Sequence, residues 1–150
     1  MKRMIERVAL VAHDNRKEAL IAWINRNREY FEGKELLTTG TTGQLVEAQT
    51  GLPVLRLQSG PLGGDQQIGA RIAEGQVDLL VFFWDPLEPM SHDPDIKALL
   101  RLATLWNIPI ACNESTADFV VASPCFNGYE RQAPDFSAYR NRQVQGTVTG

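Results

Sequence analysis

The chain has 150 residues, of which 43% are hydrophobic and 22% are charged, and its formal net charge is −3 at pH 7. This composition suits a folded domain with a sizeable core, so we expect one domain over residues 1–150. It argues against a disordered chain and, since no stripe of basic residues dominates, against a nucleic-acid-binding protein.

The sequence also indicates where the protein acts. No apolar run reaches the length of a membrane span, and the charged N-terminal residues do not resemble a signal peptide. Cys112 and Cys125 lack the spacing of metal ligands, which favours two free thiols in a reducing compartment. We therefore expect a cytoplasmic protein.

Apolar runs alternate with segments of helical periodicity along most of the chain. The runs predict strands at residues 8–12, 36–39, 54–57, 77–84 and 108–111. The helical segments cover about residues 19–33, 44–49, 66–74, 94–103 and 116–122. This alternation with short connections predicts an α/β fold: a doubly wound, mainly parallel five-stranded sheet with helices on both faces. After about residue 128 the polar sequence predicts an irregular tail with frayed last residues.

The chemically informative residues follow the predicted strands. Because the carboxyl ends of parallel strands meet at one edge of a sheet, we expect these residues to converge. In chain order they are His13 and Asp14, then Thr39, Gly40, Thr41 and Thr42, then Ser59, Gly60 and Asp65, then Asp85 and His92.

The turn at residues 59–67 connects a predicted strand to a predicted helix. Its glycines let the backbone approach a ligand, and the N–H groups at the helix start favour an anion. Asp65 has two interpretations: a helix N-cap, or a carboxylate with a chemical task beside a phosphate.

The threonine-rich turn at residues 39–43 is a second candidate anion site. Capping is the usual role of such a cluster, but three hydroxyls exceed what a cap requires. Lys17, one turn into the first helix, is either a solvated side chain or a point charge on the same anion.

Carboxylates and one imidazole gather at residues 85–95. Asp93 or Asp95 is expected to cap the following helix, and His92 is either an exposed loop residue or a tuned group in a phosphate pocket. No pair here has helical metal-ligand spacing, so we expect no metal site.

At this point the sequence resembles the methylglyoxal synthase family over roughly residues 8–127. The Gly-Gly-Asp-Gln-Gln and His-Asp-Pro-Asp blocks are the specific part of the match. The matching segments are residues 9–14, Lys17, 39–43, 59–67, 82–87, 92–95, 97–101 and 116–119.

The resemblance implies a homohexamer that converts dihydroxyacetone phosphate to methylglyoxal and inorganic phosphate, in a bypass of glycolysis, without metal or organic cofactor. It implies that Asp65 is the catalytic base and that His92 binds substrate, and the chemistry of an enediolate then makes His92 the second catalytic group, as a donor to the carbonyl oxygen. The implied substrate-binding residues are His13, Lys17, Thr39, Gly40, Thr41, Thr42, Ser59 and Gly60. The implied supporting residues are Asp14, Asp85 and Asp95. Arg140 and Arg142 are both candidates for an arginine that reaches phosphate across a subunit boundary.

A non-catalytic effector-binding domain of the same fold, such as the regulatory domain of carbamoyl phosphate synthetase, is the alternative. Both classes need the phosphate contacts, but only the lyase needs Asp65 and His92. A dedicated phosphate site in a symmetric oligomer also predicts that phosphate inhibits the enzyme and acts allosterically.

Overall fold

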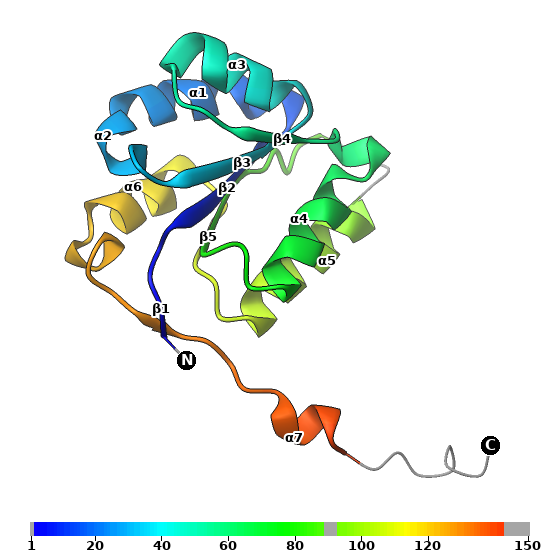
Figure 1. Cartoon of the computed structure of the whole chain (residues 1–150). Helices are drawn as coiled ribbons and strands as arrows, with labels where there is room; N and C mark the ends of the chain where they lie inside the picture. The colour runs from blue at the N-terminus through cyan, green and yellow to red at the C-terminus, as the bar shows by residue number, and fades with distance from the viewer. Residues whose placement is uncertain (1, 89–92, 143–150) are drawn as a thin grey trace.

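The computed structural model describes residues 2–88 and 93–142, and its centre is a five-stranded parallel sheet (Figure 1). The strands are β2 (Arg7–Ala12), β3 (Glu35–Thr39), β4 (Leu55–Leu57), β5 (Leu79–Phe83) and β6 (Ile110–Ala111). Their order is β4-β3-β2-β5-β6, and every neighbouring pair is parallel. The predicted fold class is confirmed.

Helices cover both faces of the sheet. They are α1 (Lys17–Arg26), α2 (Arg28–Phe31), α3 (Gly40–Thr50), α4 (Gly64–Ala73), α5 (Asp93–Leu105) and α6 (Glu114–Ala122). Along β2, Leu10 packs with α1, α3 and α6, whereas Val11 packs with α4 and α5. This alternation follows from the two-residue repeat of a strand, and a strand apolar at every position is therefore buried on both faces.

Some helices begin or end at residues other than the predicted ones, because the sequence signals for the ends of these helices are weak. The predicted helix at residues 19–33 is divided into α1 and α2 at Asn27. The predicted turn at residues 40–43 is instead the first turn of α3. Gly43 allows that turn to pack closely, because a methyl group there would lie 2.2 Å from the Thr38 hydroxyl and 2.4 Å from Arg56 Cγ.

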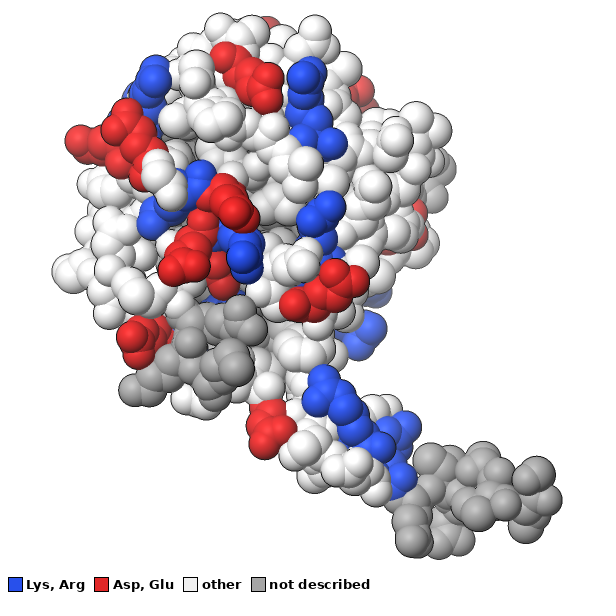
Figure 2. Space-filling view, viewed as in Figure 1, with Lys and Arg blue, Asp and Glu red and all other residues white. Residues whose placement is uncertain are grey.

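The tail has more regular structure than the sequence predicted. The pair β1 (Lys2–Arg3) and β7 (Arg131–Gln132) forms a small antiparallel sheet, so the expectation of an irregular segment is wrong here. The chain then leaves the body as a C-terminal arm, residues 133–142, which includes α7 (Ser137–Arg140) (Figure 1). Figure 2 shows acidic and basic side chains interspersed over this face of the body and mainly basic ones on the arm.

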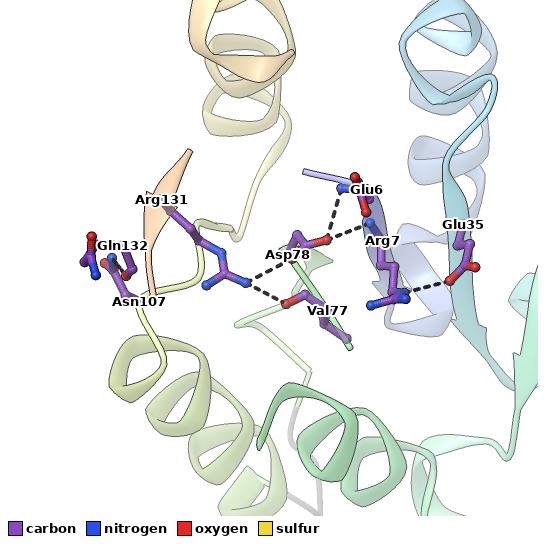
Figure 3. A network of polar contacts seen from close by, with 8 residues as sticks. All are labelled: Glu6, Arg7, Glu35, Val77, Asp78, Asn107, Arg131 and Gln132. Carbon is purple, nitrogen blue, oxygen red and sulfur yellow. Dashed lines mark hydrogen bonds and ion pairs between the residues drawn. The ribbon is translucent and has the colours of Figure 1, made fainter. Parts of the chain in front are cut away.

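A buried ion pair fixes the base of the arm to the core (Figure 3). Arg131 in β7 donates to Asp78 Oδ1 over 2.9 Å, and the two side chains are only 5% and 4% exposed. The other oxygen of Asp78 accepts from the backbone N–H groups of Glu6 and Arg7 at the start of β2. These contacts lie at the amino ends of the strands, opposite the edge that carries the predicted site.

Within the described residues, no helix has the length and apolar character needed to cross a membrane. Cys112 and Cys125 are both free, and burial raises the pKa of the Cys112 thiol.

Candidate active site

A cavity of about 440 Å³ opens at the carboxyl ends of β2, β3, β4 and β5. Val11, Leu57 and Phe82 from three of these strands form part of its wall. The strand order reverses between β2 and β5, and doubly wound sheets bind ligands at such a reversal.

Most of the predicted site residues are brought together in this cavity. Those that line it are His13, Asp14, Lys17, Thr39, Gly40, Thr41, Thr42, Ser59, Gly60 and Asp65. Asp85 lies beside it, where its backbone N–H contacts His13, and Asp95 lies in the first turn of α5, outside the described wall. Arg140 and Arg142 lie on the arm, and His92 lies outside the described residues.

Asp65 is the second residue of α4, and its side chain is 4% exposed. The N-cap of α4 is Gly63, whose φ of 103° suits glycine, so the N-cap interpretation of Asp65 is wrong. The Asp65 carboxylate lies against Gly60, where an added methyl group would be 3.2 Å from Oδ2. At the second position of α4 the carboxylate lies near the positive end of the helix dipole.

The threonine-rich turn has the features of an anion site. Thr39 is the N-cap of α3, yet its side chain makes no capping hydrogen bond. The Thr42 hydroxyl is buried and has no hydrogen-bond partner among the described residues. Gly40, with φ of 56°, brings this turn close to Ser59, since a methyl group on Gly40 would lie 3.1 Å from Ser59 Cβ. Hydroxyls not used for capping, at a helix N-terminus, are suited to a phosphate.

Lys17 reaches from α1 to the same turn. Its Nζ donates to Thr41 Oγ1 over 3.0 Å and lies 2.8 Å from Asp14 Oδ1. The hydrogen bond and positive charge of Lys17 hold the pKa of Asp14 below its ordinary value. Lys17 is therefore placed at the cavity wall rather than as a freely solvated side chain.

His13 is held in one orientation at the end of β2. Its Nδ1 accepts the backbone N–H of Asp85 over 3.0 Å, and its ring meets the Phe82 ring edge-on at a centroid distance of 5.2 Å. Because Nδ1 acts as an acceptor, the proton of a neutral imidazole is on Nε2. The ring is 6% exposed and is thus a fixed donor at the cavity.

The loop after β5 is bound to the turn at Asp14–Arg16, directly before α1, by contacts that the sequence did not predict. Asn15 Nδ2 donates to Asp85 Oδ2 over 3.2 Å and to Glu88 Oε2 over 3.4 Å. Glu88 also lines the cavity. Neither Asn15 nor Glu88 belongs to a recognisable motif. The sequence indicated a role for them only through their closeness to His13 and Asp85 along the chain.

The described wall contains more acidic than basic side chains. Asp14, Asp65 and Glu88 line it, and Lys17 is the cation among the described lining residues. In residues 2–88 and 93–142 no group of three or more His, Cys, Asp or Glu side chains is arranged to hold a metal ion.

Comparison with known proteins gives a consistent result. Residues 19–112 match the family model described as the MGS-like domain. The chain is 60% identical over 140 residues to the methylglyoxal synthase of Cellvibrio japonicus (strain Ueda107), covering 93% of this chain and 91% of the relative. It is 62% identical over 139 residues to that of Hahella chejuensis (strain KCTC 2396), with the same two coverages. The crystal structure of methylglyoxal synthase from Elizabethkingia anophelis NUHP1 superimposes with a TM-score of 0.88 at 42% identity and covers 97% of each chain.

Proposed function

The chain belongs to the methylglyoxal synthase family, and we propose that its cavity converts dihydroxyacetone phosphate to methylglyoxal and inorganic phosphate. The observation that carries the proposal is the placement of the buried Asp65 carboxylate against Gly60, within a cavity lined by threonine hydroxyls. A carboxylate beside a phosphate is electrostatically unfavourable, so its presence there indicates that it takes part in the chemistry.

Asp65 acts as the general base in the proposed reaction. It takes a proton from the hydroxymethyl carbon next to the substrate carbonyl, which produces an enediolate. The electrons of the enediolate then expel phosphate by breaking the C–O bond at the opposite carbon, and the resulting enol takes up a proton to become methylglyoxal. No redox step is involved.

Two histidines have proposed roles as donors to the substrate oxygens. The orientation of His13 supports donation from Nε2 to an oxygen of the bound substrate. The role of His92, donation to the carbonyl oxygen as negative charge develops, rests on the family resemblance alone. Neutral imidazole suits both roles, because its proton affinity is close to that of an enediolate.

The remaining residues of the cavity form the proposed phosphate site. Lys17, the hydroxyls of Thr39, Thr41 and Thr42, and Ser59 with Gly60 come from three different parts of the chain and surround one space. Contacts from several directions can fix the torsion about the bridging C–O bond. Elimination requires this bond to be perpendicular to the enediolate plane, whereas an isomerase must keep it in the plane.

The non-catalytic alternative is the weaker one. A domain that only bound a phosphorylated effector would need the hydroxyl and lysine contacts but not the buried Asp65. The relatives at 60% and 62% identity are named as synthases, which also favours the enzyme.

We further propose a homohexamer in which the C-terminal arm of one copy approaches the cavity of another. The arm starts next to Asp78, at the amino ends of the strands, while the cavity is at their carboxyl ends. Arg140 and Arg142 therefore lie on a segment that starts at the opposite end of the sheet from their own cavity, which favours the cavity of a neighbouring copy as their target. A cation from a neighbour would offset the acidic character of the described wall.

Inorganic phosphate is expected to compete with the substrate and, in the oligomer, to make the saturation curve sigmoidal. Hyperbolic kinetics across millimolar phosphate would refute the allosteric part. We expect the enzyme to act in the cytoplasm, where its phosphorylated substrate arises.

The central test uses purified protein, dihydroxyacetone phosphate and a chelator, with products followed by NMR. Wild-type protein should yield equimolar methylglyoxal and phosphate with little glyceraldehyde 3-phosphate. Asp65→Asn should fold and bind phosphate but lose turnover by several orders of magnitude, because the amide does not accept the proton. Glu74→Gln, the same change at the exposed far end of α4, is the matched control and should retain activity. Turnover of Asp65→Asn within about tenfold of wild type, a barrier change of only about 1.4 kcal/mol, would exclude Asp65 as the base.

A further inference from the structure

The peptide of Gln58 is the point where three parts of the cavity wall meet. Gln58 directly follows β4 and precedes Ser59 and Gly60. Its carbonyl oxygen accepts the backbone N–H of Gly40 over 3.3 Å, which connects it to the threonine-rich turn. Its own N–H donates to the side-chain Oε1 of Gln67 over 2.8 Å, which connects it to α4.

The backbone of α4 also packs directly on this peptide. A methyl group on Gly64 would lie 1.9 Å from the Gln58 carbonyl oxygen, so only glycine fits there. The Ser59 carbonyl accepts from the backbone N–H groups of Leu62 and Gly64, over 3.0 and 2.9 Å. The first turn of α4 and the Ser59 loop therefore form one closely packed unit.

Gln67 lies two residues after Asp65 on α4. Its side chain returns toward β4 to reach the Gln58 N–H, while Asp65 on the same turn lines the cavity. A rotation or shift of α4 would therefore move the Asp65 carboxylate relative to Gly60 and would break the Gln67 hydrogen bond at the same time.

We infer that Gln67 is a positioning residue that sets the distance between the Asp65 base and the phosphate site formed by the Ser59 loop and the threonine-rich turn. The inference rests on the proposed function, since it assigns Gln67 a role in that reaction. Gln67 does not line the cavity and acts through the Gln58 peptide. Proton transfer and phosphate departure both depend on sub-ångström placement, so a loss of this hydrogen bond should affect the chemistry more than the binding of phosphate.

Gln66 provides a matched control on the same helix turn. It is exposed like Gln67, and it is not part of the described cavity wall. Gln67→Met removes the acceptor and keeps the length of the side chain, while Gln67→Glu retains an oxygen acceptor at the same place.

The experiment measures kcat, KM, product ratio, phosphate affinity and melting temperature for wild type, Gln67→Met, Gln67→Glu and Gln66→Met. For Gln67→Met we expect kcat to fall about tenfold or more and the glyceraldehyde 3-phosphate fraction to rise, with phosphate affinity within about twofold of wild type. Gln67→Glu should recover most of the kcat, and Gln66→Met should match wild type.

Two results would overturn the inference while the wild type makes methylglyoxal. One is an unchanged kcat and product ratio in Gln67→Met. The other is a parallel loss of melting temperature, phosphate affinity and kcat that Gln67→Glu does not restore, because Gln67 would then only stabilise the fold. A wild-type protein that makes no methylglyoxal would instead refute the proposed function.

Discussion

We expect removal of the Asp78 carboxylate to lower the free energy of unfolding more than removal of a charge from any of the exposed ion pairs of the protein. The carboxylate holds three donors: the Arg131 guanidinium and the backbone N–H groups of Glu6 and Arg7, all within 3.0 Å (Figure 3). Both members of the ion pair are at least 95% buried, so water does not replace a lost partner.

The expected magnitude follows from the groups that Asp78→Leu leaves unpaired. The guanidinium of Arg131 would keep, of the acceptors found in the structure, only the Val77 carbonyl at 3.4 Å. Breaking a buried ion pair by removing one partner costs about 3–5 kcal/mol. Against a total stability of about 5–15 kcal/mol for a typical domain, this loss is severe.

Arg131→Met should cost less, because the Asp78 carboxylate retains its two backbone donors. The double variant should be more stable than the sum of the two single losses predicts, by about 1 kcal/mol or more, since it leaves no unpaired buried charge. Urea unfolding followed by circular dichroism, at one fixed protomer concentration, gives each free energy of unfolding.

The control is the neighbouring ion pair of Arg7 and Glu35, which has the same N–O distance of 2.9 Å but side chains that are 36% and 73% exposed. Glu35→Gln should change the free energy of unfolding by no more than about 1 kcal/mol. If Asp78→Leu cost as little as Glu35→Gln, the argument from burial would be refuted.

Two further predictions concern the cavity. Thr42→Ala should leave the melting temperature unchanged or raise it, because the buried hydroxyl lacks a described partner. The same change should weaken phosphate binding, measured by calorimetry, by about 1–3 kcal/mol. An unchanged phosphate affinity would remove Thr42 from the phosphate site. Lys17→Met should raise the pKa of Asp14, followed by NMR of the carboxyl carbon. The stabilisation that Asp14 gains from Lys17 is present at neutral pH and is lost as the pH falls below about 4; an Asp14 titration that Lys17→Met leaves unchanged would contradict the ion pair.

The sheet could be predicted because its central strands, β2 and β5, carry continuous apolar runs, but the role of Asp78 could not. Asp78 interrupts the run at residues 77–84, and the structure starts β5 only at Leu79. The partner that explains it, Arg131, lies 53 residues further along in a polar segment without periodicity. An isolated charge in an apolar run signals a buried partner without indicating which residue it is.

The convergence of the site could be predicted for a similar reason. His13, Thr39 and Ser59 lie at the carboxyl ends of parallel strands, and the topology alone brings them to one edge. The contacts of Asn15 and Gln67 could not be predicted, because each depends on the direction that a side chain takes between two elements. Asn15 reaches Asp85, 70 residues further along, and Gln67 returns from α4 to the Gln58 N–H after β4. Such contacts fix the exact positions of side chains in a site whose place at the sheet edge follows from the topology.

The charge of the cavity connects the proposed chemistry to the proposed assembly. Lys17 is already engaged by Asp14 at 2.8 Å, so its charge is partly compensated before a phosphate dianion enters. A protein that only stored phosphate would be expected to have a surplus of cations, whereas here Asp65 and Glu88 also face the ligand space. An enzyme that eliminates phosphate can function when the negative charge of the phosphate is only partly compensated by cations, because the product phosphate must leave the site. A basic arm supplied by a neighbouring copy would then tune both the retention of the substrate and the release of the product, and the proposed oligomer would in that case influence turnover directly.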